Sequence, residues 1–458
     1  MLKERNITFY CLRPTFATLV ALAAFWVYPS VATAAVNPST HATTATTRVS
    51  VATDGSQAPD GADASSPRAV SADGRFVAFR TLSGLVPNDT NSQDDIYVHD
   101  SLTKETTLVS VTEDGTQAGG GSARASISAN GRYVVFYSYA DTLVTNDTNG
   151  VGDIFARDLV THTTTRVNVA SDGTEANSAS GLDNPAQLSA DGRYVAFDSF
   201  ATNLVTNDTN DRQDVFVHDQ TTGSTTRASV GNGGVEANSV GGGSMAPALS
   251  ADGGFVAFSS DSTNLSAGDT NNTTDIFVRD RLNDTTARVS IASDGTQSDG
   301  QSVRPTISGD GRYVAFEGWG GHLVSNDTNN APDIFVRDRS NGTTARVSVA
   351  QHGAQANGQS WYASISGDGR FVAFQSVATN LDRLGDGDVN GTFDVFVKDQ
   401  RKGKVTRENL TPQGDPSNGF GVHPSLNANG QYVVFVGGGD LAPGDTNNLP
   451  DVYIRQRF

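Results

Sequence analysis

Cysteine is almost absent from this chain, and the single thiol, Cys11, lies in an N-terminal segment that we expect to be removed. The remaining chain would therefore contain no disulfide and carry out no thiol chemistry. Long apolar runs are also missing after that segment, so we expect no membrane span in the mature chain. No stretch from residue 46 onward has a convincing helical period, which argues against folds built on amphipathic helices.

The N-terminus has the organisation of an export signal. Three basic residues precede a mostly apolar run over residues 16–28, and Ala32-Thr33-Ala34 fits the small-x-small rule for cleavage. A transmembrane anchor is the alternative, but the run is short for a span and ends at Pro29. We predict a signal peptide over residues 1–34, a flexible leader over residues 35–45, and a secreted or periplasmic protein.

Basic residues are scarce compared with acidic ones, 32 against 50, for a formal net charge of −18. Residues 1–34 hold three Lys or Arg and one Glu, a net of +2, so the mature chain would carry −20. Such a surface repels phosphate backbones, and we expect no nucleic acid partner. It attracts cations and keeps an exported protein in solution, and we expect a monomer.

Three phrases each recur seven times after residue 45, and these repeats decide the fold. The phrase S-x-D-G-R-[YF]-V-A-F has its Asp or Asn at positions that lie 57 to 61 residues apart by subtraction. D-x-N-x-x-x-D precedes an apolar strand, and T-T-R-V-S-V-A forms another strand. The Asp or Asn positions of the first phrase are Asp73, Asn130, Asp191, Asp252, Asp310, Asp368 and Asn429.

Each repeat predicts four strands. In the first repeat these are a stretch that ends at Ser71, then residues 75–80, 96–99 and 107–111, and Asp73-Gly74 predicts a tight turn with positive φ. One such sheet cannot bury both faces, whereas radially stacked sheets cover one another. We predict an all-β, seven-bladed propeller over residues 46–458, closed because the N-terminal strand completes the last blade and removes two exposed edges.

The S-x-D-G-R-Y-V-A-F and D-I-F-V-R-D phrases resemble those of TolB-like, WD-repeat-like β-propellers of bacterial envelope and secreted proteins. The resemblance covers residues 46–458 and implies the propeller architecture. It implies little about function, because this fold hosts binding proteins, lyases and peptidase accessory domains.

The D-x-N-x-x-x-D loops suggest two interpretations. Asp and Asn at positions 1, 3 and 7 offer hard oxygen ligands for calcium, although the phrase lacks the central Gly and terminal Glu of an EF-hand. Alternatively, they form Asx-turns that start the next strand, and sevenfold repetition favours this architectural role. The candidate calcium ligands are Asp89, Asn91, Asp95, Asp147, Asn149, Asp153, Asp208, Asn210, Asp214, Asp269, Asn271, Asp275, Asp327, Asn329, Asp333, Asp388, Asn390, Asp394, Asp445, Asn447 and Asp451.

Departures from the repeat are more informative about function, because architecture does not need them. Both tryptophans of the mature chain lie at such departures. Trp319 lies in the segment that follows the second strand of its repeat, and Trp361 precedes a first strand, which lines the channel of a propeller. Aromatic and arginine side chains there suit a protein or glycan ligand, or they could simply plug the channel. The candidate ligand-binding residues are Trp319, His322, Trp361, Tyr362, Arg68, Arg124, Arg304 and His423.

The sequence points to a binding module and leaves two alternatives. A polysaccharide lyase or glycosidase would need a pair of carboxylates about 5 to 10 Å apart at the channel mouth, and a purely structural cell-surface protein would have a plugged channel. No pair of histidines has metal-site spacing, and we expect His99 and His218 to be surface residues. No G-x-S-x-G elbow is present, which argues against a peptidase.

Overall fold

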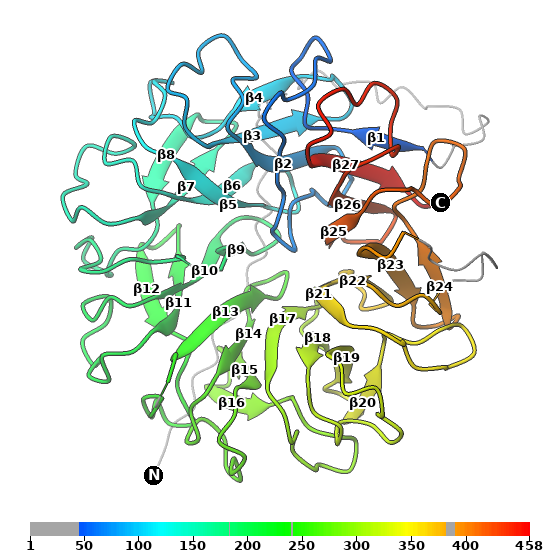
Figure 1. Ribbon diagram of the computed structural model, residues 1–458. Helices are drawn as coiled ribbons and strands as arrows, with labels where there is room; N and C mark the ends of the chain where they lie inside the picture. Colours follow the sequence, from blue (N-terminus) through cyan, green and yellow to red (C-terminus); the bar gives the residue numbers. More distant parts are fainter. Residues whose placement is uncertain (1–44, 183, 240, 382–389) are drawn as a thin grey trace, which may run out of the picture. The chain divides into compact units, whose positions relative to one another are not determined.

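The computed structural model describes residues 45–182, 184–239, 241–381 and 390–458, which form 27 strands and no helix. Seven antiparallel sheets follow one another around a ring (Figure 1). The predicted all-β, seven-bladed propeller is therefore confirmed. The expected signal peptide, almost all of the expected leader, and Asp388 fall outside the described residues. Within these ranges there is no helix of the length and apolarity that a bilayer crossing requires.

The first four blades are numbered from the N-terminal side of the ring. The first contains β2 (Phe76–Thr81), β3 (Asp95–Asp100) and β4 (Thr106–Leu108), with single bridges at Asp63 and Val70 in place of a regular inner strand. The next three are β5 (Ser122–Ile127), β6 (Tyr133–Ser138), β7 (Asp153–Asp158) and β8 (Thr163–Arg166); β9 (Gln187–Leu188), β10 (Tyr194–Ser199), β11 (Asp214–Asp219) and β12 (Ser224–Arg227); and β13 (Ser244–Leu249), β14 (Phe255–Ser260), β15 (Asp275–Asp280) and β16 (Thr285–Arg288).

The last three blades repeat this pattern, and the seventh takes its outer strand from the N-terminus. They are β17 (Ser302–Ile307), β18 (Tyr313–Gly318), β19 (Asp333–Asp338) and β20 (Thr343–Arg346); β21 (Ser360–Ile365), β22 (Phe371–Ser376), β23 (Asp394–Asp399) and β24 (Lys404–Arg407); and β25 (Gly421–Leu426), β26 (Tyr432–Gly437), β27 (Asp451–Gln456) and β1 (Thr46–Arg48).

Strand β1 closes the ring by pairing with β27. The two strands are antiparallel, with Arg48 opposite Tyr453, and the Val49 N–H donates to the Val452 carbonyl at 2.8 Å. The Arg48 Nε lies 3.1 Å from the Asp451 carboxylate. A segment 400 residues away in sequence thus supplies both the backbone pairing and the charge that the last blade lacks.

The core lies between neighbouring blades. One apolar cluster combines Ile96 and Val98 of the first blade with Val134 and Phe136 of the second, and all four are buried. Burial of apolar area contributes about 25 cal/mol per Å². The inner faces of adjacent sheets therefore provide the main stabilising contacts, as the repeats predict.

The turn between the first and second strands of each blade needs glycine for two reasons. Gly74 has φ +76°, while the preceding Asp73 does not adopt positive φ and instead accepts hydrogen bonds from Ser71 Oγ and the Arg75 N–H. A Cβ on Gly74 would lie 2.2 Å from the Tyr432 ring of the neighbouring blade. Our prediction of positive φ is thus right for the glycine and wrong for the aspartate.

The third strands contain the two histidines that we expected at the surface, and that prediction is wrong. His99 and His218 are 2% and 6% exposed, and each Nδ1 forms a hydrogen bond of 2.9 Å to a threonine hydroxyl on the fourth strand. Burial lowers the pKa of His99 to about 4. These side chains lie inside the blades because every residue of β3 and β11 is buried.

Removal of β1 tests ring closure. A chain that begins at residue 52 lacks β1 and Val49, so β27 becomes an exposed edge. We expect its thermal midpoint to fall by about 10 °C or more. The matched control begins at residue 45 and retains β1. Equal midpoints for the two truncated chains would show that closure does not depend on this strand.

Candidate functional site

A pocket of about 950 Å³ opens at one end of the central channel, and we call it the mouth pocket. It is lined by the beginnings of the inner strands, which lie beside the D-x-N-x-x-x-D loops. Its volume falls within the range typical of small-molecule sites. The lining residues are Asp63, Ser65, Pro67, Arg80, Ala123, Arg124, Asn184, Pro185, Gln187, Met245, Ala246, Pro247, Ser259, Gln301, Val303, Arg304, Pro305, Thr306, Trp319, Trp361, Tyr362, Ala363, His423 and Pro424.

A β-bulge in five inner strands turns side chains into the mouth pocket. Pairing between the first and second strands shifts register at the same place in the second, fourth, fifth, sixth and seventh blades. One residue in each bulge has positive φ although it is not glycine, which is uncommon and is often found where side chains are functional. These residues are Arg124, Ala246, Arg304, Tyr362 and His423.

Side chains from the preceding blade hold most of these bulges in place. The Tyr362 N–H donates to Glu317 Oε1 at 2.7 Å, and the His423 N–H donates to Gln375 Oε1 at 2.9 Å. Asp198 and Ser259 accept from Ala246 and Arg304 in the same way. The strained backbone is therefore fixed by buried acceptors before any ligand arrives.

One side of the mouth pocket is rich in aromatic rings. Trp319 and Trp361 form an edge-to-face pair with centroids 5.4 Å apart, and Tyr362 and His423 form another at 4.7 Å. The Arg304 guanidinium lies over the Tyr362 ring at 4.9 Å. The structure thus brings together five of the eight residues that the sequence suggested for ligand binding.

A second aromatic group lies on the second and third blades. Tyr137 and Tyr139 pair edge to face at 4.9 Å, and the Arg124 guanidinium lies 5.9 Å from the Tyr137 ring. Tyr139 and Phe200, at the same position of consecutive repeats, are 63% and 42% exposed. Both groups contain an arginine beside an aromatic ring, and in the ring of seven blades they lie on different sides of the channel (Figure 1).

Charges at the mouth pocket are unevenly paired. Arg304 Nη1 lies 3.0 Å from the buried Glu317, whose pKa is raised by burial against the opposing effect of Arg304. His423 Nδ1 lies 3.5 Å from Asp63, which also lies 3.8 Å from Arg80. Arg124 makes no ion pair with any residue in the part of the chain that the structure describes.

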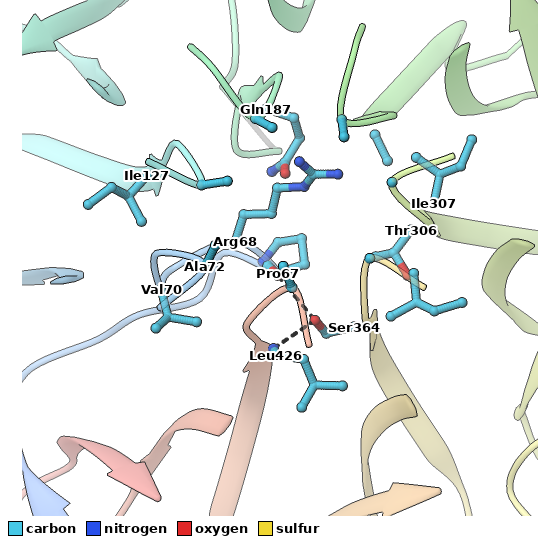
Figure 2. Close-up of a pocket in the computed structure, with 18 residues that line it drawn as sticks. Pro67, Arg68, Val70, Ala72, Ile127, Gln187, Thr306, Ile307, Ser364 and Leu426 are labelled. Atoms are coloured by element: carbon cyan, nitrogen blue, oxygen red, sulfur yellow. Dashed lines mark hydrogen bonds between the residues drawn. The ribbon is translucent and has the colours of Figure 1, made fainter. Parts of the chain in front are cut away.

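Arg68 lies deeper in the channel and reaches across it. Its side chain extends across the channel toward Gln187 (Figure 2), and its guanidinium donates to the carbonyls of Leu188, at 3.0 Å, and Leu249. No carboxylate among the described residues pairs with it, and desolvation lowers the pKa of Arg68 to about 10. A smaller cavity of about 110 Å³ continues below it, lined mainly by alanine, glycine and aliphatic side chains.

His322, unlike the other predicted ligand-binding residues, lies neither in the lining of the mouth pocket nor in the channel below it. Its Nε2 is 3.6 Å from the Asp299 carboxylate, and both side chains are exposed. The structure thus places six of the eight predicted residues in the lining and Arg68 below it.

Sequence reasoning missed a column of residues that supports the mouth pocket. It is the position after the final Phe of S-x-D-G-R-[YF]-V-A-F, and it varies while the rest of the phrase repeats. The sequence therefore contained a signal for these residues, because this one position differs between repeats while the phrase before it stays nearly the same. The column consists of Arg80, Tyr137, Asp198, Ser259, Glu317, Gln375 and Val436.

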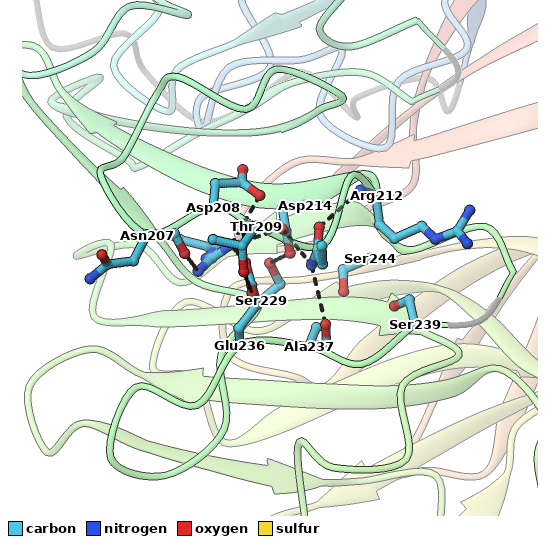
Figure 3. Close-up of polar contacts among 12 residues, drawn as sticks. Asn207, Asp208, Thr209, Arg212, Asp214, Ser229, Glu236, Ala237, Ser239 and Ser244 are labelled. Atoms are coloured by element: carbon cyan, nitrogen blue, oxygen red, sulfur yellow. Dashed lines mark hydrogen bonds and ion pairs between the residues drawn. The ribbon is translucent and has the colours of Figure 1, made fainter.

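The D-x-N-x-x-x-D loops contain an internal cation in the form of arginine. Arg227 Nη1 lies 3.3 Å from Asp208, 3.1 Å from Asp214 and 2.7 Å from Glu236, the three acidic residues shown in Figure 3. These three carboxylates are close enough to hold a metal ion, but the guanidinium already occupies the space between them. The corresponding arginines that contact the last Asp of their loops are Arg48, Arg166, Arg227, Arg288, Arg346 and Arg407.

The asparagine in these loops forms turn hydrogen bonds. Asn210 Oδ1 accepts the Arg212 N–H at 2.8 Å, and its Nδ2 donates to the Ala237 carbonyl at 3.1 Å. Asn91 in the first blade does the same with Gln93 and Ala118. These contacts are those of the Asx-turn interpretation.

The first blade lacks the arginine, because Leu108 occupies its position opposite Tyr97. Gln117 Nε2 donates to Asp89 at 2.6 Å and to Asp95 at 2.9 Å, and the Tyr97 hydroxyl donates to Asp89. Two adjacent carboxylates therefore share hydrogen bonds but no positive charge.

Comparison with known proteins supports the architecture. No protein-family model matches the chain, and no curated protein sequence matches it either. An oligogalacturonate lyase in complex with manganese is similar in structure, with a TM-score of 0.53 at 12% identity over 90% of this chain and 92% of the other. The β-propeller domain of the Trilobed protease from Pyrococcus furiosus has a TM-score of 0.51 at 11% identity, over 86% and 95%.

A putative TolB from Agrobacterium tumefaciens is also similar, with a TM-score of 0.41 at 14% identity over 80% of this chain and 98% of the other. At these identities the matches above 0.5 show a common propeller fold and nothing about ligand or activity.

The variant Asp95→Asn tests the effect of the positive charge that the first blade lacks. Desolvation, with repulsion from Asp89, raises the pKa of Asp95 to about 6. The folded chain then keeps a proton between about pH 4 and 6 that the unfolded chain has lost, so stability falls as pH rises through that window. We expect Asp95→Asn to remove this fall and to raise the thermal midpoint near neutral pH.

The matched control is Asp153→Asn in the second blade, where Arg166 Nη1 lies 3.3 Å from the carboxylate. This change leaves the buried arginine with fewer negative partners and should lower the midpoint at the same pH. Thermal unfolding from pH 4 to 8 measures both. Shifts in the same direction for the two variants would contradict the distinction between the loops.

Proposed function

We propose that this chain is an exported binding protein, secreted or periplasmic, that takes a protein or glycan ligand into the mouth pocket as a monomer. The observation that carries the proposal is the set of strained bulges held by buried acceptors, such as Tyr362 on Glu317. Backbone strain is retained where the surrounding structure fixes it, and such places are frequently ligand sites. Fixing the side chains in advance reduces the entropy lost on binding.

The rest of the mouth pocket is consistent with recognition. Proline follows the strained residue in three blades, at Pro247, Pro305 and Pro424, and restricts the backbone further. Partly exposed aromatic rings offer large contact areas with few rotatable bonds. Because Arg68 crosses the channel below, a ligand would enter and leave through the mouth.

A lyase or glycosidase using the same pocket is the alternative. Carboxylates of Asp63, Asp198 and Glu317 lie at or beneath it, and one structural neighbour is an oligogalacturonate lyase. All three accept hydrogen bonds or pair with cationic groups of the protein itself, which fits supporting roles. Chromatography of oligosaccharides incubated with the protein would show shortened products if the chain were an enzyme.

Calcium is part of the proposal only for the loop that contains Asp89, Asn91 and Asp95. Its carboxylates provide the hard oxygen donors that calcium prefers, and no arginine lies between them. In the loops with arginine, the guanidinium would have to leave before an ion could bind. The ion would supply the positive charge that the first blade lacks.

Thermal unfolding with excess calcium and with chelator tests this part. Binding to the folded state alone stabilises by about 2.7 kcal/mol at a hundredfold excess over the dissociation constant. We expect an upward shift that Asp89→Asn abolishes and that Asp147→Asn, in a loop with arginine, retains. No shift, or an equal shift in both variants, would assign the Asp89 loop to turn architecture alone.

Truncation of Trp361 tests the binding function. The labelled protein is applied to arrays of immobilised oligosaccharides and peptides, and the pattern is compared with that of Trp361→Ala. We expect a ligand retained by the native chain to be lost by this variant, because the Trp319–Trp361 pair is broken. The control is Leu282→Ala, a truncation of an exposed apolar side chain in a turn outside the pocket. Native retention that survives Trp361→Ala, or no retention on either array, would contradict the proposal.

A further inference from the structure

Arginine side chains gather at the mouth pocket of a molecule that is acidic overall. The formal net charge of the whole chain is −18, and residues 1–34 carry a net charge of +2. The chain without these residues therefore has a formal net charge of −20. The lining of the mouth pocket contains three arginines, one histidine and a single carboxylate, that of Asp63. Arg80 pairs with Asp63 and Asp94, and Arg304 pairs with Glu317, so Arg124 is the arginine of the lining that has no ion pair with a described residue. Solubility does not explain an unpaired arginine in this recess, because the acidic surface already provides solubility.

The cationic groups of the pocket retain donors for a ligand. Arg124 makes no ion pair with a described residue and is only half-buried. The Arg304 side chain is 42% exposed, and its pairing with Glu317 uses Nη1. A planar guanidinium with free N–H groups binds carboxylate or sulfate oxygens in a bidentate manner.

The uncharged part of the lining suits sugar rings. The flat C–H faces of pyranoses pack on aromatic rings, and the lining contains the rings of Trp319, Trp361 and Tyr362. The amide side chains of Asn184, Gln187 and Gln301 can both donate and accept, which matches hydroxyl groups. The mouth therefore combines sugar-packing surfaces with anion-binding groups.

We infer that the mouth pocket recognises an oligosaccharide bearing carboxylate or sulfate groups, whose rings pack on the Trp319–Trp361 pair and whose oxyanions pair with Arg124 and Arg304. This inference rests on the proposed binding function and specifies its ligand. An extended peptide is the less favoured ligand, because the inner strands that form the mouth are bulged at this point and offer no regular edge for strand addition.

Four probes of similar size separate the sources of this chemistry: a linear oligouronate, a sulfated oligosaccharide, a neutral oligosaccharide, and a peptide of glutamate and tyrosine. The affinity of the chain without residues 1–34 for each probe is measured by calorimetry. We expect at least one of the two anionic oligosaccharides to bind more tightly than the neutral one and than the peptide. Which of them binds more tightly identifies the oxyanion.

The variant Arg124→Gln should lower the affinity for the anionic oligosaccharide about 10- to 100-fold and leave the affinity for the neutral one nearly unchanged. The matched control is Arg212→Gln, which removes the same charge from an exposed loop and should alter neither affinity. Retained thermal midpoints show that both variants are folded. Added salt should weaken binding of the anionic probe to the native chain.

Each other outcome overturns the inference and leaves a distinct conclusion about the proposed function. Tighter binding of the neutral oligosaccharide, or equal effects of the two arginine variants, shows a glycan site without anion recognition. Binding of the peptide alone shows a protein-binding site. Failure of all four probes overturns the inference, while ligand retention lost in Trp361→Ala on the arrays would still support the proposed function.

Discussion

The structure depends on a contact in which an aromatic ring of one blade lies against a turn glycine of the next. A Cβ would come within 2.2 Å of Tyr432 at Gly74, and within 2.4 Å of Phe76 at Gly131. A side chain there would displace one blade from its neighbour. Because seven blades must return to their starting point for β1 to pair with β27, small displacements would accumulate around the ring and prevent that pairing.

Ring closure separates repeated positions from positions that are free to vary. The arginine that lies between Asp208, Asp214 and Glu236 fixes one loop in the same way as its counterparts fix others. Removing one member of such a buried group leaves an uncompensated charge, so these positions are under the same constraint in the six blades that have the arginine. Variation is tolerated where a side chain reaches the channel mouth, as at Arg304, Tyr362 and His423, which occupy the same position in consecutive blades.

The sequence was sufficient to predict the seven blades, the closing strand and six residues of the mouth pocket lining, because these follow from repetition and from departures from it. The bulges were not predictable, since the Tyr362 backbone with positive φ donates its N–H to the Glu317 carboxylate of another blade, a contact that the sequence does not reveal. Leu108 departs visibly from the repeat. The consequence of this departure becomes clear only when the structure shows that the arginine at the same position of other blades pairs with the loop carboxylates. His99 was misjudged because a polar residue on a strand gives no indication of the threonine that satisfies it.

Electrostatic interactions affect any ligand of this protein at two distances. At long range the net negative charge opposes anions, an effect that salt screens beyond about 10 Å. At short range the exposed donors of Arg124 and Arg304 face a recess from which bulk water is partly excluded, where charge-assisted hydrogen bonds are strong. A polyanion without apolar faces, such as a nucleic acid backbone, experiences mainly the repulsion. An anion whose rings also pack on Trp319 and Trp361 gains contacts that offset this repulsion, so the acidic surface itself contributes to selectivity.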